Sequence, residues 1–201
     1  MADFAVRVYP VRGEIARNTT IGVEEMQRMA GPSAAKHFPL LGMAGGAFSA
    51  ALVVDASTAE IGPDLVCAIP RLIKVRIGYV DRTVFIAKEA ADDACLYKET
   101  LEHELRHARI YDEVVDAFVP IVTDQIKISV KQVRLHPEPS AATAETRLRH
   151  QIAVPVNAVI KDLKEENNKR QAEVDSPQEV ARLRAACDGR GARLAKQGSG
   201  L

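Results

Sequence analysis

Hydrophobic residues in the first half of the chain alternate with polar ones, which is the pattern of β-strands. The alternation is clearest over residues 72–77, where isoleucine and valine fall on one face and lysine and arginine on the other. Residues 4–9, 48–55 and 83–87 are also strand-like, and 23–30 predict a short helix. Because turn-forming residues separate 72–77 from 83–87, we expect these two strands to form an antiparallel hairpin.

From about residue 94 the hydrophobic period becomes helical. It predicts helices over 97–118, 121–135 and 141–174, with Pro120 kinking or ending the first of them. The sequence Ser-Pro-Gln-Glu at 176–179 has the form of a capping box with proline at the first helical position, so a last short helix should begin there.

The bulk composition limits the possible partners. The chain has 201 residues, of which 47% are hydrophobic, so it can bury a core. Its 27 basic and 27 acidic residues balance, which argues against nucleic acid or anionic lipid as a partner. No apolar run reaches the roughly 20 residues that span a bilayer, and no secretory signal is visible at residues 1–10.

Residues 103–107 read H-E-L-R-H inside a predicted helix. Residues four apart share a helix face, so His103 and His107 can bind one zinc ion at about 2.1 Å. Glu104 lies beside them, placed to take a proton from water that the zinc activates. The motif therefore predicts a zinc-dependent hydrolase with Glu104 as its general base.

A catalytic zinc needs a third protein ligand, which the sequence does not name outright. Glu113 and Asp112 follow the motif but point away from the face of His103 unless the helix breaks early. If instead the long helices pack antiparallel about a turn near 137–139, residues near 174 face His103, which brings in Asp175 and Glu173. We favour Asp175, because Ser176 can serve as the N-cap of the last helix and Asp175 is then not needed for that role. Glu165 and Glu166 are further alternatives.

Tyr111 shares the metal face of the helix, one turn beyond His107. Its hydroxyl could donate a hydrogen bond to the oxyanion of a tetrahedral intermediate. The alternative is that the ring packs against the sheet.

Three cysteines leave the redox compartment open. A bridge between Cys67 and Cys95 would tie a strand to the start of the motif helix, and two buried thiols are the alternative. Cys187 is expected to be free and reactive near the end of the last helix.

The expected fold is α+β: a small antiparallel sheet packed on the long H-E-x-x-H helix, followed by an extended helical hairpin. We expect an α+β domain over 1–118, a helical extension over 119–188 and a flexible, glycine-containing tail over 189–201.

Several short patterns together resemble a family of predicted bacterial secreted zinc-dependent proteases that is otherwise uncharacterised. The resemblance covers roughly residues 4 to 120. It is carried by Tyr9 with 11–13, Gly31-Pro32, Cys67 with the strands up to Ala87, and Cys95-Leu96-Tyr97 leading into the motif. It implies a zincin-like peptidase, a periplasmic or secreted location and a Gram-negative type of source. In zincins the substrate lies along a sheet edge, for which 83–87 is the candidate strand.

The function expected from these observations is zinc-dependent hydrolysis of a peptide or protein substrate. A rival from another class is a non-catalytic binding module, in which any zinc is structural and the long helices form a coiled-coil-like arm that could mediate self-association. A cell-wall amidase is a second rival, which would share every ligand and differ only in the cleft.

Overall fold

The computed structural model describes residues 4–31 and 40–198, so Pro32 and residues 199–201 of the expected tail lie outside the described residues. The chain divides into two compact units. The first contains Met1–Val11, Phe48–Gly78 and Glu113–Glu166, and the second contains Arg12–Ala47, Tyr79–Asp112 and Asn167–Leu201. The expected domains followed one another along the chain and met at residue 118. Each observed unit is instead made of three separated segments, because long strands and helices run from one unit into the other.

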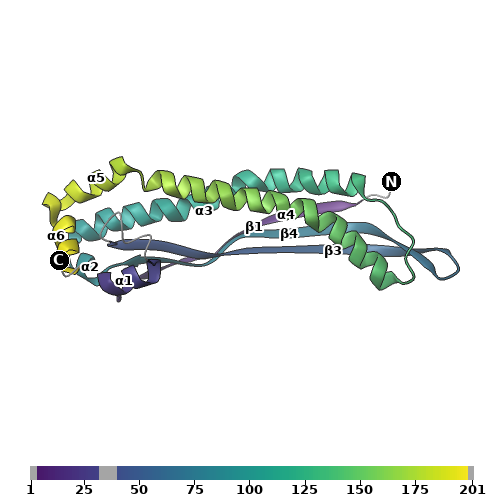
Figure 1. The fold of residues 1–201 in the computed structure, drawn as a ribbon, viewed down its shortest axis with the longest axis horizontal. Helices are drawn as coiled ribbons and strands as arrows, with labels where there is room; N and C mark the ends of the chain where they lie inside the picture. The colour runs from purple at the N-terminus through teal and green to yellow at the C-terminus, as the bar shows by residue number, and fades with distance from the viewer. Residues whose placement is uncertain (1–3, 32–39, 199–201) are drawn as a thin grey trace. The chain divides into compact units, whose positions relative to one another are not determined.

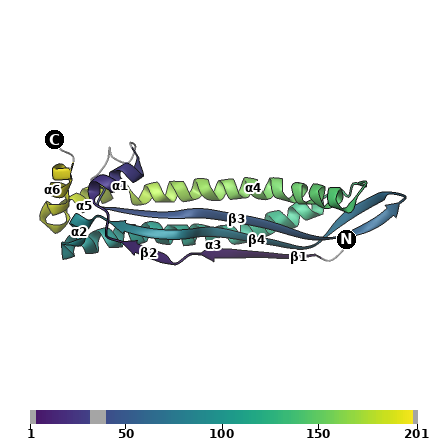
Figure 2. The same cartoon turned by 90° about the horizontal axis from the view of Figure 1, so that it is seen from below.

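The fold is α+β, with an open sheet that has four strands among the described residues. Its strands are β1 (Ala5–Arg12), β2 (Ile15–Asn18), β3 (Gly42–Gly62) and β4 (Leu65–Ile86). In the first unit β4 lies between β1 and β3 (Figure 2). In the second unit β4 pairs with β2 in parallel, with Ile15 opposite Arg82 and Asn18 opposite Phe85. The expectation of a purely antiparallel sheet is therefore wrong. A parallel pair needs a long crossover, here made of α1 (Val23–Ala30) and β3, and alternation along the chain does not indicate strand direction.

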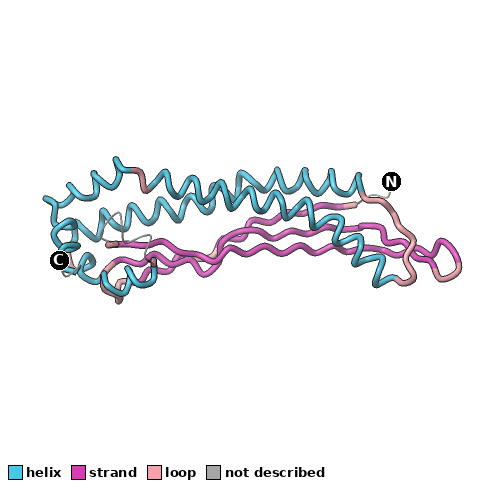
Figure 3. Tube along the Cα trace, in the orientation of Figure 1, coloured by secondary structure: helices cyan, strands magenta, loops and turns pink. Residues whose placement is uncertain are grey.

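The predicted hairpin over 72–87 is also wrong, because residues 72–86 lie within the single strand β4. The reversal occurs earlier, at residues 63–64 between β3 and β4 (Figure 3), where Asp64 has a left-handed φ of 55°. Gly78 serves close packing instead of a turn. A Cβ at this position would lie 1.9 Å from the carbonyl oxygen of Val11, so only glycine lets β1 approach β4 here.

The core of the first unit lies between the sheet and two helical segments. The predicted inward face of β4 is confirmed, since Ile73, Val75 and Ile77 are all fully buried. Segments of α3 (Ala94–Gln132) and α4 (Ala141–Val174) lie on one face of the strands (Figure 1). These segments contribute the buried residues Val114, Val122, Ile126, Ile152 and Leu163.

The helix α3 continues through Pro120, so two separate helices over 97–118 and 121–135 are not formed. Proline in a helix interior removes one backbone hydrogen bond and costs about 3 kcal/mol. Val115 and Val122 on either side of it are 1% and 0% exposed. Their burial offsets the cost and keeps the two halves in one helix.

The second unit contains α1 and several short helices after α4. The predicted bounds of α1 are confirmed, and Gly31 ends it with a φ of 77°. The others are α2 (Lys88–Ala91), α5 (Pro177–Ala185), the 3-10 turn η2 (Ala186–Gly189) and α6 (Arg190–Gly198). Residues 190–198 are thus helical, where a flexible tail was expected, because Leu194 packs against the core. That core contains Val23, Met26, Leu41, Val84, Ile86 and Leu96.

Among the described residues, no helix combines the length and the apolar character that crossing a membrane would require.

Candidate metal centre

The motif helix is fixed at its start and held against the sheet farther along. The carboxylate of Asp93 caps α3 by accepting from the backbone N–H groups of Cys95 at 2.9 Å and Leu96 at 3.2 Å. Arg82 of β4 is only 4% exposed and donates to Asp112 at 3.0 Å and to the Ala108 carbonyl. These contacts lie on either side of His103 and His107 and fix the helix that carries both imidazoles.

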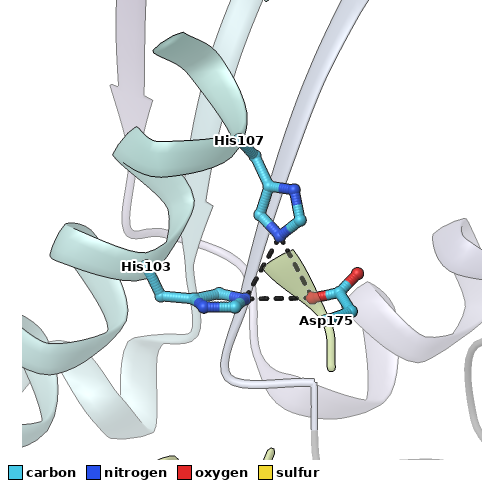
Figure 4. Close-up of side chains that lie close together, drawn as sticks. All are labelled: His103, His107 and Asp175. Atoms are coloured by element: carbon cyan, nitrogen blue, oxygen red, sulfur yellow. Dashed lines mark hydrogen bonds and ion pairs between the residues drawn. The ribbon is translucent and has the colours of Figure 1, made fainter. Parts of the chain in front are cut away.

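His103, His107 and Asp175 converge on one point in the second unit. Each histidine is less than 10% exposed, and Asp175 follows the last residue of α4. The side chains point toward one another (Figure 4). Asp175 Oδ1 lies 3.2 Å from His103 Nε2 and 3.1 Å from His107 Nε2, and the two Nε2 atoms are 3.2 Å apart.

The separation of these three donor atoms suits a metal ion. In a tetrahedral zinc site with bonds of about 2.0 to 2.1 Å, neighbouring donors lie about 3.3 to 3.4 Å apart. The observed 3.1 to 3.2 Å is close to that spacing on all three sides of the triangle. The three residues form a possible metal-binding site whose metal is not identified by the geometry.

Gln171 determines which nitrogen of His107 carries the proton. Its side-chain amide nitrogen donates to the His107 backbone carbonyl at 3.1 Å, which turns the amide oxygen toward His107 Nδ1. An amide oxygen can only accept, so Nδ1 carries the hydrogen. In neutral His107, Nε2 then keeps its lone pair, which is the form that binds a metal.

Glu179 and Arg106 both contact the Nδ1 atom of His103. The Oε1 atom of Glu179 lies 3.3 Å from His103 Nδ1 and also accepts from Arg106. Hydrogen bonds from Arg182 and Arg106 hold the Glu179 pKa at about 2, well below the ordinary value, so this carboxylate is ionised at neutral pH. Arg106 Nη2 lies at the same distance, 3.3 Å, from His103 Nδ1, so this nitrogen sits between a carboxylate that can only accept and a guanidinium that can only donate. These contacts hold the ring with Nε2 directed toward Asp175 and His107.

Glu104 is buried beside the ligand group without belonging to it. It is 5% exposed, and its carboxylate accepts from the backbone N–H of Ala44 in β3. Burial raises its pKa to about 7, although the two histidines and this hydrogen bond act in the opposite direction. Gly42 makes room for it, because a Cβ there would lie 2.6 Å from Glu104 Oε1.

The electrostatics of the ligand group favour an ionised carboxylate. Burial acts to raise the Asp175 pKa, but the hydrogen bonds from His103 and His107 outweigh it and hold that pKa well below the usual range. Burial acts to lower the His107 pKa, but Asp175 and Glu104 raise it above its usual value. Asp175 is thus an ionised acceptor that either the imidazole N–H groups or a cation in their place can neutralise.

A cavity of about 540 Å³ opens onto these side chains. This volume lies within the range of small-molecule sites, about 300 to 1,000 Å³. All of its lining residues belong to the second unit, and they include the three possible ligands, Glu104 and Tyr111. The strand beside it is the start of β3, with Gly42, Met43 and Ala44 among the lining residues. Residues 83–86 lie instead in β4, which has β2 and β3 as its neighbours in this unit. The expectation that 83–87 form the edge strand is therefore wrong.

Tyr111 both packs against the sheet and faces the metal centre, the two alternatives that the sequence offered. Its ring packs on Tyr79 of β4, with centroids 4.2 Å apart, and it also lines the cavity. Burial raises its pKa, so the hydroxyl keeps its proton at neutral pH. Its predicted part in catalysis stays a prediction.

The other acidic candidates are not members of the ligand group found among the described residues. Asp112 is bound to Arg82, and Glu173 lines a different cavity together with Arg106 and Arg170. Glu165 pairs with Lys161 at 3.4 Å. Glu113 and Glu166 belong to the first unit.

The predicted cysteine pairing is wrong. Cys95 is bridged to Cys187 with Cα atoms 5.9 Å apart, and Cys67 is the buried free thiol. The bridge joins the start of α3 to the turn η2 after α5. Cys187 is therefore not the reactive thiol that its position near a helix end suggested.

Sequence reasoning missed the roles of Gln171, Glu179 and Gly42. Gln171 precedes Asp175 by four residues, so helical periodicity could have found it once Asp175 was chosen. Glu179 was assigned to a capping box. Ser176 does cap α5 by accepting from the Glu179 backbone N–H at 3.3 Å, but the carboxylate of Glu179 is directed to Arg106 and His103. Gly42 has no signal in the sequence, since its contact with Glu104 is tertiary.

Comparisons of the chain with protein-family models, with curated proteins and with solved structures give no match.

Proposed function

We propose that this protein is a zinc-dependent metallopeptidase in which His103, His107 and Asp175 hold the metal and Glu104 is the general base. The convergence of two imidazoles and one carboxylate within 4.8 Å, next to a buried glutamate, carries the proposal. Two histidines and one carboxylate form the donor set of hydrolytic zinc enzymes, in which a fourth position is left for water, whereas structural zinc sites use four protein ligands rich in cysteine.

Zinc held by this group would acidify a water molecule and polarise the scissile carbonyl. Glu104 then takes the proton from the attacking water and passes it to the departing amine. Its burial suits this exchange, because a carboxyl with a pKa of about 7 can both accept and donate a proton at neutral pH. Tyr111 is proposed to donate its hydroxyl hydrogen to the developing oxyanion.

The start of β3 is proposed as the strand along which a peptide binds. Among the described residues β3 pairs only with β4, and its residues Gly42, Met43 and Ala44 line the cavity. An extended peptide can add to such an edge through main-chain hydrogen bonds, which recognise any sequence. This arrangement supports a peptide or protein as the substrate.

We also propose that the protein works in an oxidising compartment, the periplasm or the exterior of a bacterial cell. The Cys95–Cys187 disulfide supports this, since such bridges persist mainly outside the cytosol. The resemblance to secreted zinc-dependent proteases points the same way.

Metal analysis tests the site. Protein purified without added zinc should contain about one zinc per chain, and His103→Ala should lose it, because two ligands do not replace three. Zinc that is retained by the variant would overturn the assignment.

Replacement of Glu104 with Gln tests catalysis. The change keeps the size of the side chain and removes the base, so zinc content should hold while cleavage of casein or a mixed peptide library falls about 100-fold to 10,000-fold. Glu102→Gln is the matched control, because Glu102 is exposed on the same helix. Equal cleavage by Glu104→Gln and wild type would contradict the mechanism, and zinc binding with no cleavage by either would favour a non-catalytic binding module.

A further inference from the structure

The cavity beside the ligand group changes in character along its length. Along α3 its lining runs from Leu96 through His103 and His107 to Tyr111, and successive members lie on one helix face. Opposite them, α5 contributes Leu183 near one end, whereas α4 contributes Gln171 and Asn167 near the other. The possible metal ligands thus separate an apolar end from an amide-lined end.

The apolar end is a built part of the fold. Leu96 is 3% exposed and Leu41 is 5% exposed, and both belong to the core of the second unit. Met43 packs against the same core, and Val180 and Leu183 complete the lining from α5. Leu96 lies two helical turns before His103, or about 10 Å along the axis, and Thr100 lines the cavity between them.

The charges near this end are compensated. Glu99 lines the cavity, but its carboxylate accepts from Arg182 at 2.6 Å, and Arg182 also binds Glu179. A charged substrate group placed here would lose its hydration and would find no unpaired opposite charge to bind. Its transfer from water would therefore be unfavourable. For an apolar substrate group, the transfer from water to this end of the cavity is favourable.

We propose that the substrate places a large apolar side chain, next to the bond that is cleaved, in the pocket formed by Leu41, Met43, Leu96, Val180 and Leu183. This inference rests on the proposed function and adds its substrate class: peptides with leucine, phenylalanine or a similar residue beside the scissile bond.

Hydroxamates that bind zinc test this without any cleavage assay. Acetohydroxamate probes the metal position alone, the 4-methylpentanoyl hydroxamate adds a branched apolar chain, and the hydroxamate of succinic acid adds a carboxylate of similar length. Calorimetric titration of the zinc-loaded protein should give an affinity about 10-fold to 100-fold higher for the branched compound than for acetohydroxamate. The carboxylate compound should gain nothing over acetohydroxamate.

The proposed function and the apolar pocket can be refuted separately. If acetohydroxamate does not bind the zinc-loaded protein, the open metal position is absent and both proposals fall. If it binds but the branched chain adds less than about 3-fold, or the carboxylate adds as much, the proposed function stands and the apolar pocket is wrong.

A variant locates the pocket. Leu183→Asn should reduce the ratio of the branched to the acetohydroxamate affinity at least about 5-fold, and this ratio is insensitive to a general change in zinc loading. Val154→Asn is the control, since Val154 is 56% exposed in the first unit, and it should leave the ratio unchanged. An unchanged ratio in Leu183→Asn would remove the pocket from this place.

Discussion

Removal of the Cys95–Cys187 disulfide should destabilise the protein by several kilocalories per mole. The bridge joins residues 92 positions apart, and closing a loop of this length in the unfolded chain corresponds to about 4.6 kcal/mol at room temperature. Single domains are stable by only about 5 to 15 kcal/mol, so this change is a large fraction of the total. The loss should also reach the site, because α5, which carries Glu179, lies just before Cys187.

The assay is urea unfolding of the metal-free protein followed by circular dichroism. The Cys95→Ser, Cys187→Ser double variant should unfold at lower urea than wild type, with a steeper dependence on denaturant because its unfolded chain exposes more surface. A reducing agent should bring wild type close to the variant and leave the variant itself unchanged. A difference in unfolding free energy below about 1 kcal/mol would refute the reasoning, since the bridge would then restrict the unfolded chain hardly at all.

Three further predictions concern side chains around the metal centre. Gly42→Ala should lower the unfolding free energy by about 1 to 3 kcal/mol, because the new Cβ would lie 2.6 Å from Glu104 Oε1. In the control Gly45→Ala the new Cβ meets nothing within 4 Å, and the unfolding free energy should change by under about 1 kcal/mol. Equal effects of the two variants in urea unfolding would contradict the predicted clash. Gln171→Leu removes the acceptor for His107 Nδ1 and should weaken zinc binding about 10-fold to 100-fold in chelator competition, while Gln171→Glu keeps an acceptor and should bind zinc about as tightly as wild type. The Glu104 pKa is raised by burial from 4.5 to about 7, so the stability that this group contributes is fully present below about pH 4.5 and is lost as pH rises through about 7. Metal-free wild type should therefore lose stability relative to the always neutral Glu104→Gln over that window, and a gap that does not vary with pH would count against the shift.

Local patterns determined much of this protein from the sequence alone. The 3.6-residue period located α1 and α4 at their observed bounds, and alternation identified the buried face of β4, because both periods follow directly from backbone geometry. The spacing of His103 and His107 places them on one helix face for the same reason. Asp175 was chosen by assuming antiparallel helices, which is an argument about a simple tertiary arrangement.

Only the tertiary structure decided the remaining features, because each depends on residues that are far apart in the chain. The parallel pairing of β2 with β4, the choice of Cys187 as the partner of Cys95 and the continuation of α3 through Pro120 all depend on packing between distant segments. Glu179 illustrates the limit within the site. Its position three residues after Ser176 predicts a local cap, but its carboxylate binds Arg182 on the same helix and also Arg106 and His103 of α3. Arg182 could be found from helical spacing, whereas the contacts to α3 become known only when the chain has folded.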